Sequence, residues 1–144
     1  MARKTVVVPV VLVAALGVGS FASAQTNADQ AKQALKQANE LSARQEYVAA
    51  TAKYEEAIRL DPALVDAYAA LAKIQDAATA EQTLISAVNA NPRDGKAYGH
   101  LADYYTRLGQ FDKTIDAYRQ WADVEPSNAG PRYWIASFYW DKAN

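Results

Sequence analysis

One short motif ends three successive segments of the chain at nearly regular spacing. The segments close with Ala-Ile-Arg-Leu-Asp-Pro, Ala-Val-Asn-Ala-Asn-Pro and Trp-Ala-Asp-Val-Glu-Pro, whose last residues are Pro62, Pro92 and Pro126. Internal repeats of this length indicate stacked units, because one helical hairpin cannot bury its apolar face alone and a stack of hairpins can. This repeat constrains the fold more than any other feature of the sequence.

The residues between the prolines follow a helical period. After each of the first two prolines, a tyrosine is followed three residues later by Leu-Ala. Leu101, Tyr104, Tyr105 and Leu108 occupy positions i, i+3, i+4 and i+7, which lie on one face of a helix. Gly109 then favours a left-handed end to that helix. Because no stretch alternates strictly between polar and apolar residues, we expect helices and no strands.

In these features the chain resembles the tetratricopeptide repeat (TPR) family, whose unit is a helix–turn–helix of about 34 residues. The repeats are expected at residues 31–64, 65–94 and 95–128, followed by a last helix at 129–142. The third unit shows the resemblance most clearly, through Tyr98, Leu101, Ala102, Tyr105, Gly109, Phe111, Tyr118 and Pro126. The resemblance implies an all-α fold: an α-α superhelix (TPR solenoid) of about three repeats plus a final C-terminal helix, within a domain of residues 25–144.

The sequence departs from the family pattern in two places. The second unit is shorter than the other two, and the loss is expected near Gln75 to Thr79, around the turn between its helices. Trp121 stands where the family usually has alanine, and Thr114 replaces another common alanine. The bulk of Trp121 predicts that the packing between the third unit and the last helix opens or changes register.

Residues 1–24 have the order of a secretory signal peptide. Arg3 and Lys4 precede an apolar run from Val6 to Leu16, and Ala22-Ser23-Ala24 places small residues at a cleavage site. We expect cleavage between Ala24 and Gln25 and a mature protein that is periplasmic or secreted, without stable membrane insertion. The alternative is a retained anchor, although the apolar run is shorter than the ~20 residues that span a bilayer.

Composition and motifs exclude most enzymatic chemistry. The chain has no cysteine and one histidine, so thiolate and multi-histidine metal sites are excluded. It carries no nucleotide-binding, zinc-protease or hydrolase motif, and His100 has no nucleophile placed beside it. A net charge of −1 argues against nucleic acid as a partner. We therefore expect no catalytic, cofactor-binding or metal-binding residue.

The family resemblance implies instead a concave groove, lined by the first helices of successive units, that holds a peptide. Carried over by position, the expected groove residues are Lys32, Leu35, Asn39, Asp66, Ala69, Lys73, Lys96, Gly99, Asp103, Thr106, Arg107, Tyr133, Ser137 and Trp140. This surface mixes both signs of charge with aromatic rings at one end. Such a mixture suits a partner protein or peptide better than a polyanion.

One TPR subfamily clamps a C-terminal carboxylate with Lys and Asn on its first helix and Lys and Arg on the first helix of its third unit. Asn39 and Lys96 match that set. Leu35 and His100 stand where the clamp needs Lys and Arg. The sequence therefore does not favour a carboxylate clamp.

The last helix is crowded with aromatic residues between Tyr133 and Trp140, on most of its circumference. A helix that is apolar all round is usually covered on several sides. The expected function is an exported scaffold that binds a partner peptide or protein in its groove, in the cell envelope. Two alternatives remain: the substrate-recruiting N-terminal module of a longer enzyme or transport/secretion component, and self-association through this helix.

Overall fold

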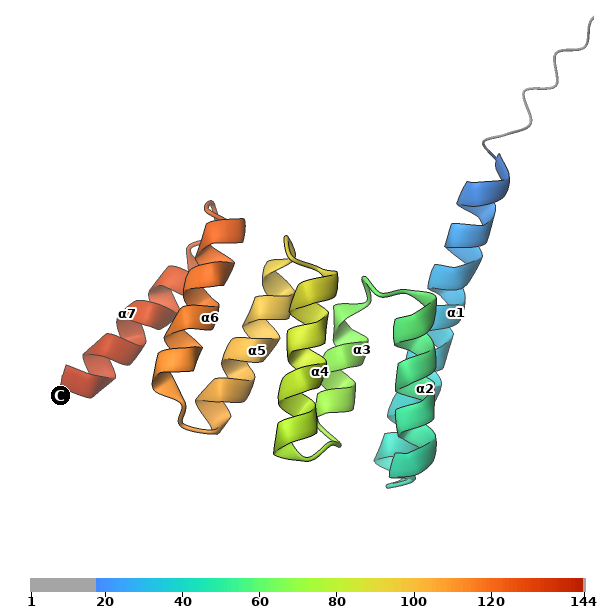
Figure 1. The fold of residues 1–144 in the computed structure, drawn as a ribbon, viewed down its shortest axis with the longest axis horizontal. Helices are drawn as coiled ribbons and strands as arrows, with labels where there is room; N and C mark the ends of the chain where they lie inside the picture. Colours follow the sequence, from blue (N-terminus) through green and yellow to red (C-terminus); the bar gives the residue numbers. More distant parts are fainter. Residues whose placement is uncertain (1–17, 144) are drawn as a thin grey trace, which may run out of the picture.

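A computed structural model describes residues 18–143, with side-chain surroundings for 26–140. The described residues form seven α-helices and no strand: α1 (Val18–Ala43), α2 (Tyr47–Leu60), α3 (Val65–Ala72), α4 (Ala77–Ala90), α5 (Gly95–Arg107), α6 (Phe111–Val124) and α7 (Gly130–Ala143). Successive helices run antiparallel and stand side by side in one curved row, with α1 and α7 at its two ends (Figure 1). The predicted all-α class is confirmed.

The helices form three hairpins and one unpaired helix. α1 pairs with α2, α3 with α4 and α5 with α6, while α7 packs against α6. α1 has 26 residues and α2 has 14, so α1 extends well past its partner (Figure 1). Most of the predicted signal peptide lies outside the described residues, and α1 continues without a break through the predicted cleavage point. No helix in the described part of the chain has the length and apolar character needed to cross a bilayer.

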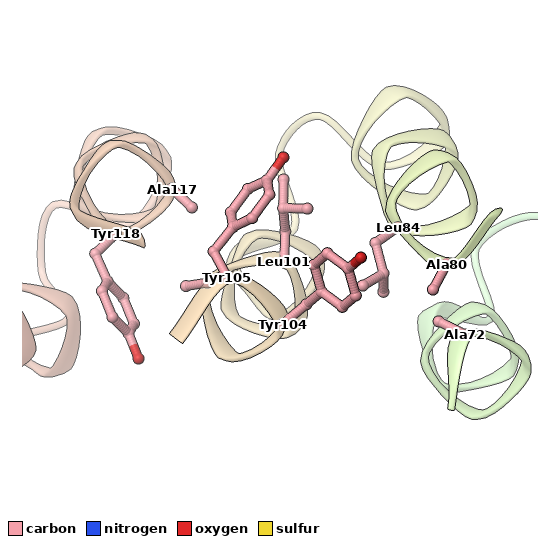
Figure 2. Close-up of a cluster of buried hydrophobic side chains, with 9 residues drawn as sticks. Ala72, Ala80, Leu84, Leu101, Tyr104, Tyr105, Ala117 and Tyr118 are labelled. Atoms are coloured by element: carbon pink, nitrogen blue, oxygen red, sulfur yellow. The ribbon is translucent and has the colours of Figure 1, made fainter. Parts of the chain in front are cut away.

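Small residues are buried where paired helices approach. Ala38, Ala72 and Ala102 are buried at equivalent places on α1, α3 and α5. In the core cluster of Figure 2, Ala72 of α3 faces Ala80 of α4, and large side chains of α4 to α6 fill the space beside them. Ala136 holds the same place on α7 but is exposed, because no further helix covers it in the described residues.

The ends of the helices follow from local chemistry. Asp76 caps α4 by accepting hydrogen bonds from the backbone N–H groups of Ala78 and Thr79, both at 3.1 Å. Gly109 has φ +67° and ends α5, as predicted. Its N–H donates to the Thr106 carbonyl, and the next N–H donates to the Tyr105 carbonyl, which is the Schellman arrangement.

Gln45 closes the first hairpin in the same way, although it is not a glycine. Its φ is 63°, and its N–H and that of Glu46 donate to the carbonyls of Ser42 and Leu41. The left-handed conformation costs a residue with a Cβ roughly 1 kcal/mol or more. Nothing in the sequence pattern distinguishes this glutamine from an ordinary turn residue.

Gln45→Gly is expected to raise the free energy of unfolding by about 0.5–1 kcal/mol. The glycine removes the Cβ strain, and the greater freedom of the unfolded chain offsets part of the gain. Urea denaturation of the two proteins measures the difference. Gln45→Ala is the control, because alanine keeps the Cβ and is expected to leave stability nearly unchanged; equal stability of the glycine variant would contradict the strain.

The residues missing from the second unit are lost from a helix rather than from the turn. α3 has eight residues and ends at Ala72, whereas α5 has 13. The expectation of a loss near Gln75–Thr79 is therefore corrected. The physical reason is local: the N–H groups of Lys73 and Ile74 already close a turn onto Ala70 and Leu71, and the Asp76 cap starts α4 immediately afterwards.

Trp121 is accommodated inside the third hairpin. A Cβ built on Gly95 would lie 2.0 Å from Trp121 Nε1, and one on Gly99 would lie 3.0 Å from its Cζ3. The indole of α6 therefore occupies the space that these two glycines leave on α5. At the equivalent positions the second hairpin has Val65 on α3 and Ala87 on α4, which are packed in one core cluster. The large and small residues have thus changed places between helices, and this replaces the predicted opening of the packing toward the last helix.

Candidate binding groove

Two pockets lie next to each other along α5. The first, here called the aromatic pocket, has a volume of about 470 Å³ and is lined by Lys96, Gly99, His100, Asp103, Tyr118, Trp121, Glu125 and Trp134. The second, here called the basic pocket, has a volume of about 440 Å³ and is lined by Ala69, Ala72, Lys73, Leu84, His100, Asp103, Thr106 and Arg107. His100 and Asp103 line both, so the two pockets form one groove. Each is large enough to receive side chains of a bound peptide.

Half of the expected groove residues line these pockets. They are Ala69, Lys73, Lys96, Gly99, Asp103, Thr106 and Arg107. The other expected residues line neither: Lys32, Leu35, Asn39, Asp66, Tyr133, Ser137 and Trp140. The structure thus brings together the expected residues of α5 and the end of α3.

The expected residues of α1 take other roles. Leu35 is half-buried and packs against the core clusters around Tyr54 and Ala57. Asn39 is exposed, but its side-chain oxygen accepts a hydrogen bond of 2.8 Å from the Tyr54 hydroxyl. Lys32 is exposed. Two of these three side chains therefore hold the first hairpin together, which follows from their contacts with α2.

Aromatic rings form one wall of the aromatic pocket. The ring of Tyr118 lies 6.2 Å from that of Trp121 and 6.5 Å from that of Trp134, centre to centre. The interplanar angles are 23° and 15°, so each indole lies nearly parallel to the Tyr118 ring. In Figure 2, the hydroxyls of Tyr118 and Tyr105 point to opposite sides of the helix row. Tyr118 thus turns its hydroxyl toward the groove and Asp103, at 3.5 Å.

The charges in this pocket are mainly acidic. Glu125 accepts hydrogen bonds from the Gly95 N–H (3.1 Å) and from Trp121 Nε1 (2.7 Å). A hydrogen bond from Asn128, and then that from Trp121, hold the pKa of Glu125 below its usual value. Lys96 brings a positive charge to the lining, but it forms an ion pair of 2.8 Å with Asp66. Glu125 and Asp103 therefore set the sign of the pocket.

The basic pocket has an apolar floor and a cationic rim. Ala69, Ala72 and Leu84 supply the floor. Lys73 and Arg107 are exposed at the rim, and neither forms an ion pair within the part of the chain that the structure describes. The pocket lies between the end of α3 and the last turn of α5, which extends beyond the end of α3. The shortening of α3 is therefore what leaves this space open.

Sequence reasoning missed five residues of the aromatic pocket as groove residues. They are His100, Tyr118, Trp121, Glu125 and Trp134. Family positions identify the first helix of each hairpin, and three of these residues belong to α6 or to the turn after it. The usable signal was the pair Gly95 and Gly99 in the same unit as an unusual tryptophan, because missing side chains on one helix give room for a large one on the next. In the described residues, no group of three or more His, Asp or Glu side chains could hold a metal ion.

The raised pKa values of two buried tyrosines predict that the protein loses stability at alkaline pH. Burial, together with Asp103, raises the pKa of Tyr118 to about 12, and burial, together with Glu81, raises the pKa of Tyr105 to about 12. In the unfolded chain both phenols ionise near pH 10. The unfolded state therefore releases protons first, and the stability that these groups contribute is present below pH 10 and lost between pH 10 and about 12.

Urea denaturation between pH 9 and 12 measures this loss. The free energy of unfolding is expected to fall more steeply in the native chain than in a Tyr105→Phe/Tyr118→Phe variant, which has no phenol at these positions. Tyr47→Phe is the control, because Tyr47 is exposed. Identical slopes in the native chain and the double variant would show that these two phenols do not titrate as described.

Comparisons with known proteins agree with this fold. Residues 95–128 match the family model Tetratricopeptide repeat, over the same residues as the third expected repeat. The first TPR domain of Spaghetti (RPAP3), bound to the HSP90 peptide SRMEEVD, is 19% identical with a TM-score of 0.59, over 81% of this chain and 96% of that one. The Arabidopsis OM64 TPR domain is 20% identical with a TM-score of 0.54, over 77% and 95%.

The first TPR domain of human RPAP3 is 19% identical with a TM-score of 0.59, over 79% of this chain and 93% of that one. No curated protein matches the chain in sequence. Identities this low establish a shared fold and leave the ligand open. Residues 95–128 therefore match one tetratricopeptide repeat, and the described helices share the fold of TPR domains.

Proposed function

We propose that this protein is a non-enzymatic scaffold that binds a peptide segment of another protein in the groove along α5, and that it acts as an exported protein in the cell envelope. The observation that carries the binding role is the pair of adjoining pockets, which offer apolar surface together with charges that have no oppositely charged partner in the described chain. Sites of this kind bind ligands by burying apolar surface and using a few polar groups to fix orientation.

The relative bound to an HSP90 peptide supports a peptide as the ligand, but not the same peptide. The chain has Leu35 and His100 at two positions where a carboxylate clamp needs Lys and Arg. The two matching residues already have partners, since Asn39 bonds to Tyr54 and Lys96 pairs with Asp66. The proposed ligand is therefore recognised by its side chains rather than by a terminal carboxylate.

A pull-down from envelope extract tests the groove. In the groove variant, Lys73, Asp103 and Arg107 are replaced together by Met, Asn and Met. In the control variant the same replacements are made at Lys36, Asp123 and Arg59, which are exposed and line neither pocket. Proteins retained by the native chain and the control, but lost from the groove variant, are the expected result. If the groove variant retains the same proteins, the groove is not the binding site.

Export rests on the sequence of residues 1–24. Mass spectrometry of the protein from its host tests it: a chain that begins at Gln25 in the periplasmic or culture fraction is expected. A chain that still begins at Met1 and remains in the cytoplasmic fraction would contradict export, and one that begins at Met1 in the membrane fraction would indicate a retained anchor.

A second candidate is favoured by the exposed aromatic rings of α7. Tyr133 is 67% exposed and Tyr139 is 51% exposed. Such rings indicate a surface that is covered in the working protein, either by further sequence of a longer enzyme or transport/secretion component or by a second copy. The reading frame beyond Asn144 tests the first form, and a stop codon there removes it. Light scattering tests the second, and a monomer at all concentrations removes it.

A further inference from the structure

We propose that the groove selects a peptide segment with one basic and one acidic side chain, the basic one bound in the aromatic pocket and the acidic one in the basic pocket. The inference rests on the proposed peptide-binding function and specifies its ligand. Its basis is that two adjoining pockets, each suited to one side chain, carry opposite charge.

The aromatic pocket has the features that bind a cation. The faces of aromatic rings attract ammonium and guanidinium groups, and tryptophan does so most strongly. Here Trp121 and Trp134 line the pocket together with the carboxylates of Asp103 and Glu125. Within the described residues, Asp103 forms no ion pair, and its Oδ1 accepts a hydrogen bond of 3.5 Å from the Tyr118 hydroxyl. An arginine or lysine head group would supply the charge that this carboxylate lacks.

Lys96 does not reverse the sign of the aromatic pocket. Its Nζ lies 2.8 Å from Asp66 Oδ2, and that carboxylate is also 3.7 Å from His100 Nε2. The hydrogen bond from Lys96 is the main cause of a lowered pKa at Asp66, so the Asp66 carboxylate is ionised at neutral pH. The two charges of the pair offset each other, and Asp103 and Glu125 are left to act on the ligand.

The basic pocket has the features that bind a carboxylate. Lys73 of the turn after α3 and Arg107 at the end of α5 are exposed cations on the same pocket. Arginine can hold a carboxylate through two parallel hydrogen bonds. The apolar floor of Ala69, Ala72 and Leu84 suits the methylene groups of a glutamate side chain.

Asp103 lies where the two pockets meet and fixes the orientation of the peptide. It attracts a basic side chain into the aromatic pocket and repels an acidic one from it. Lys73 and Arg107 do the reverse in the basic pocket. Specificity then comes from the contacts of the correct orientation and from like-charge repulsion in the wrong one.

Defined peptides test this selection. The probes are octapeptides of alanine and serine, blocked at both ends, that carry one arginine and one glutamate at every relative spacing. Matched peptides replace arginine by uncharged citrulline or glutamate by glutamine. Two of the three tryptophans of the chain line the aromatic pocket, so the intrinsic fluorescence of the full 144-residue protein reports binding there.

The expected result is binding at one or a few spacings, with affinity about fivefold lower when arginine becomes citrulline. In the Asp103→Asn variant this difference is expected to shrink, because Glu125 and the two indoles remain in the pocket. It is expected to keep its full size in Asp123→Asn, a matched exposed carboxylate that lines neither pocket. Asparagine keeps an oxygen for the Tyr118 hydroxyl, and an unchanged urea midpoint confirms folding. In the Lys73→Gln/Arg107→Gln variant, the difference in affinity between the glutamate peptide and its glutamine counterpart is expected to disappear.

Other outcomes overturn the inference in distinguishable ways. If a peptide binds but citrulline is as good as arginine, or if Asp103→Asn keeps the full arginine preference, the charge selection is wrong and peptide binding stands. If no probe binds while the groove variant still loses partners in the pull-down, the inference fails and the proposed function stands. If no probe binds and the pull-down is insensitive to the groove variant, both fail.

Discussion

Gly95→Val is expected to lower the free energy of unfolding by about 2–3 kcal/mol, the size typical of overpacking a filled site. A Cβ at Gly95 would lie 2.0 Å from Trp121 Nε1, 2.2 Å from Trp121 Cδ1 and 2.5 Å from Glu125 Cδ. The indole cannot simply move aside, because it stacks on Tyr118 and donates a hydrogen bond to Glu125. Urea denaturation measures the loss, and a change no larger than that of an ordinary surface substitution would contradict the fit of indole to glycine.

A double-mutant cycle separates this fit from a general intolerance of valine. Trp121→Ala alone is expected to cost about 2 kcal/mol, less than for a fully buried tryptophan because the side chain is half-buried. Gly95→Val/Trp121→Ala gives the third hairpin the same two residues that the second hairpin has at the equivalent positions, Val65 and Ala87. We expect the double variant to be more stable than the sum of the single losses predicts, by about 2 kcal/mol. Additive losses would contradict the account in which the small residue on α5 makes room for the large residue on α6.

Leu84→Ala is expected to lower the free energy of unfolding by about 3 kcal/mol. Leu84 is 2% exposed and lies in the core cluster where α3, α4 and α5 meet (Figure 2). Its loss leaves a cavity between the second and third hairpins, where the stack depends on contacts between neighbours. Val48→Ala is the control, because Val48 is 90% exposed and is expected to change stability by less than about 0.5 kcal/mol. A loss below about 1 kcal/mol at Leu84 would contradict its place in the shared core.

The sequence predicts the helices of this protein well because their determinants are local or periodic. The three endings at Pro62, Pro92 and Pro126 follow the second helix of each hairpin, and Gly109 ends α5 as predicted. The turn at Gln45 could not be recognised, because a glutamine in the left-handed conformation is held there by the hairpin around it. The sequence shows that the second unit is short but not which element loses the residues, so it does not predict the shortening of α3.

The groove was predicted only in part because its walls come from two kinds of position. Carrying family positions over to α3 and α5 identifies Lys73, Asp103 and Arg107, which line the pockets. The aromatic wall depends on Trp121 and Trp134, and their positions follow from how α6 packs against α5 and α7 against α6. Contacts of this kind depend on the size of the side chain on the facing helix. The periodicity of one helix does not predict that size.

Site-specific photo-crosslinking tests most directly whether the groove along α5 is the binding surface. A photoreactive phenylalanine is placed at Lys96, an exposed residue that lines the aromatic pocket, or at Val48, which is 90% exposed and lines neither pocket. Each protein is irradiated in envelope extract, and crosslinked species are separated by mass. We predict a discrete crosslinked partner from position 96 and none from position 48. The same partner from position 48, with none from position 96, would contradict the account.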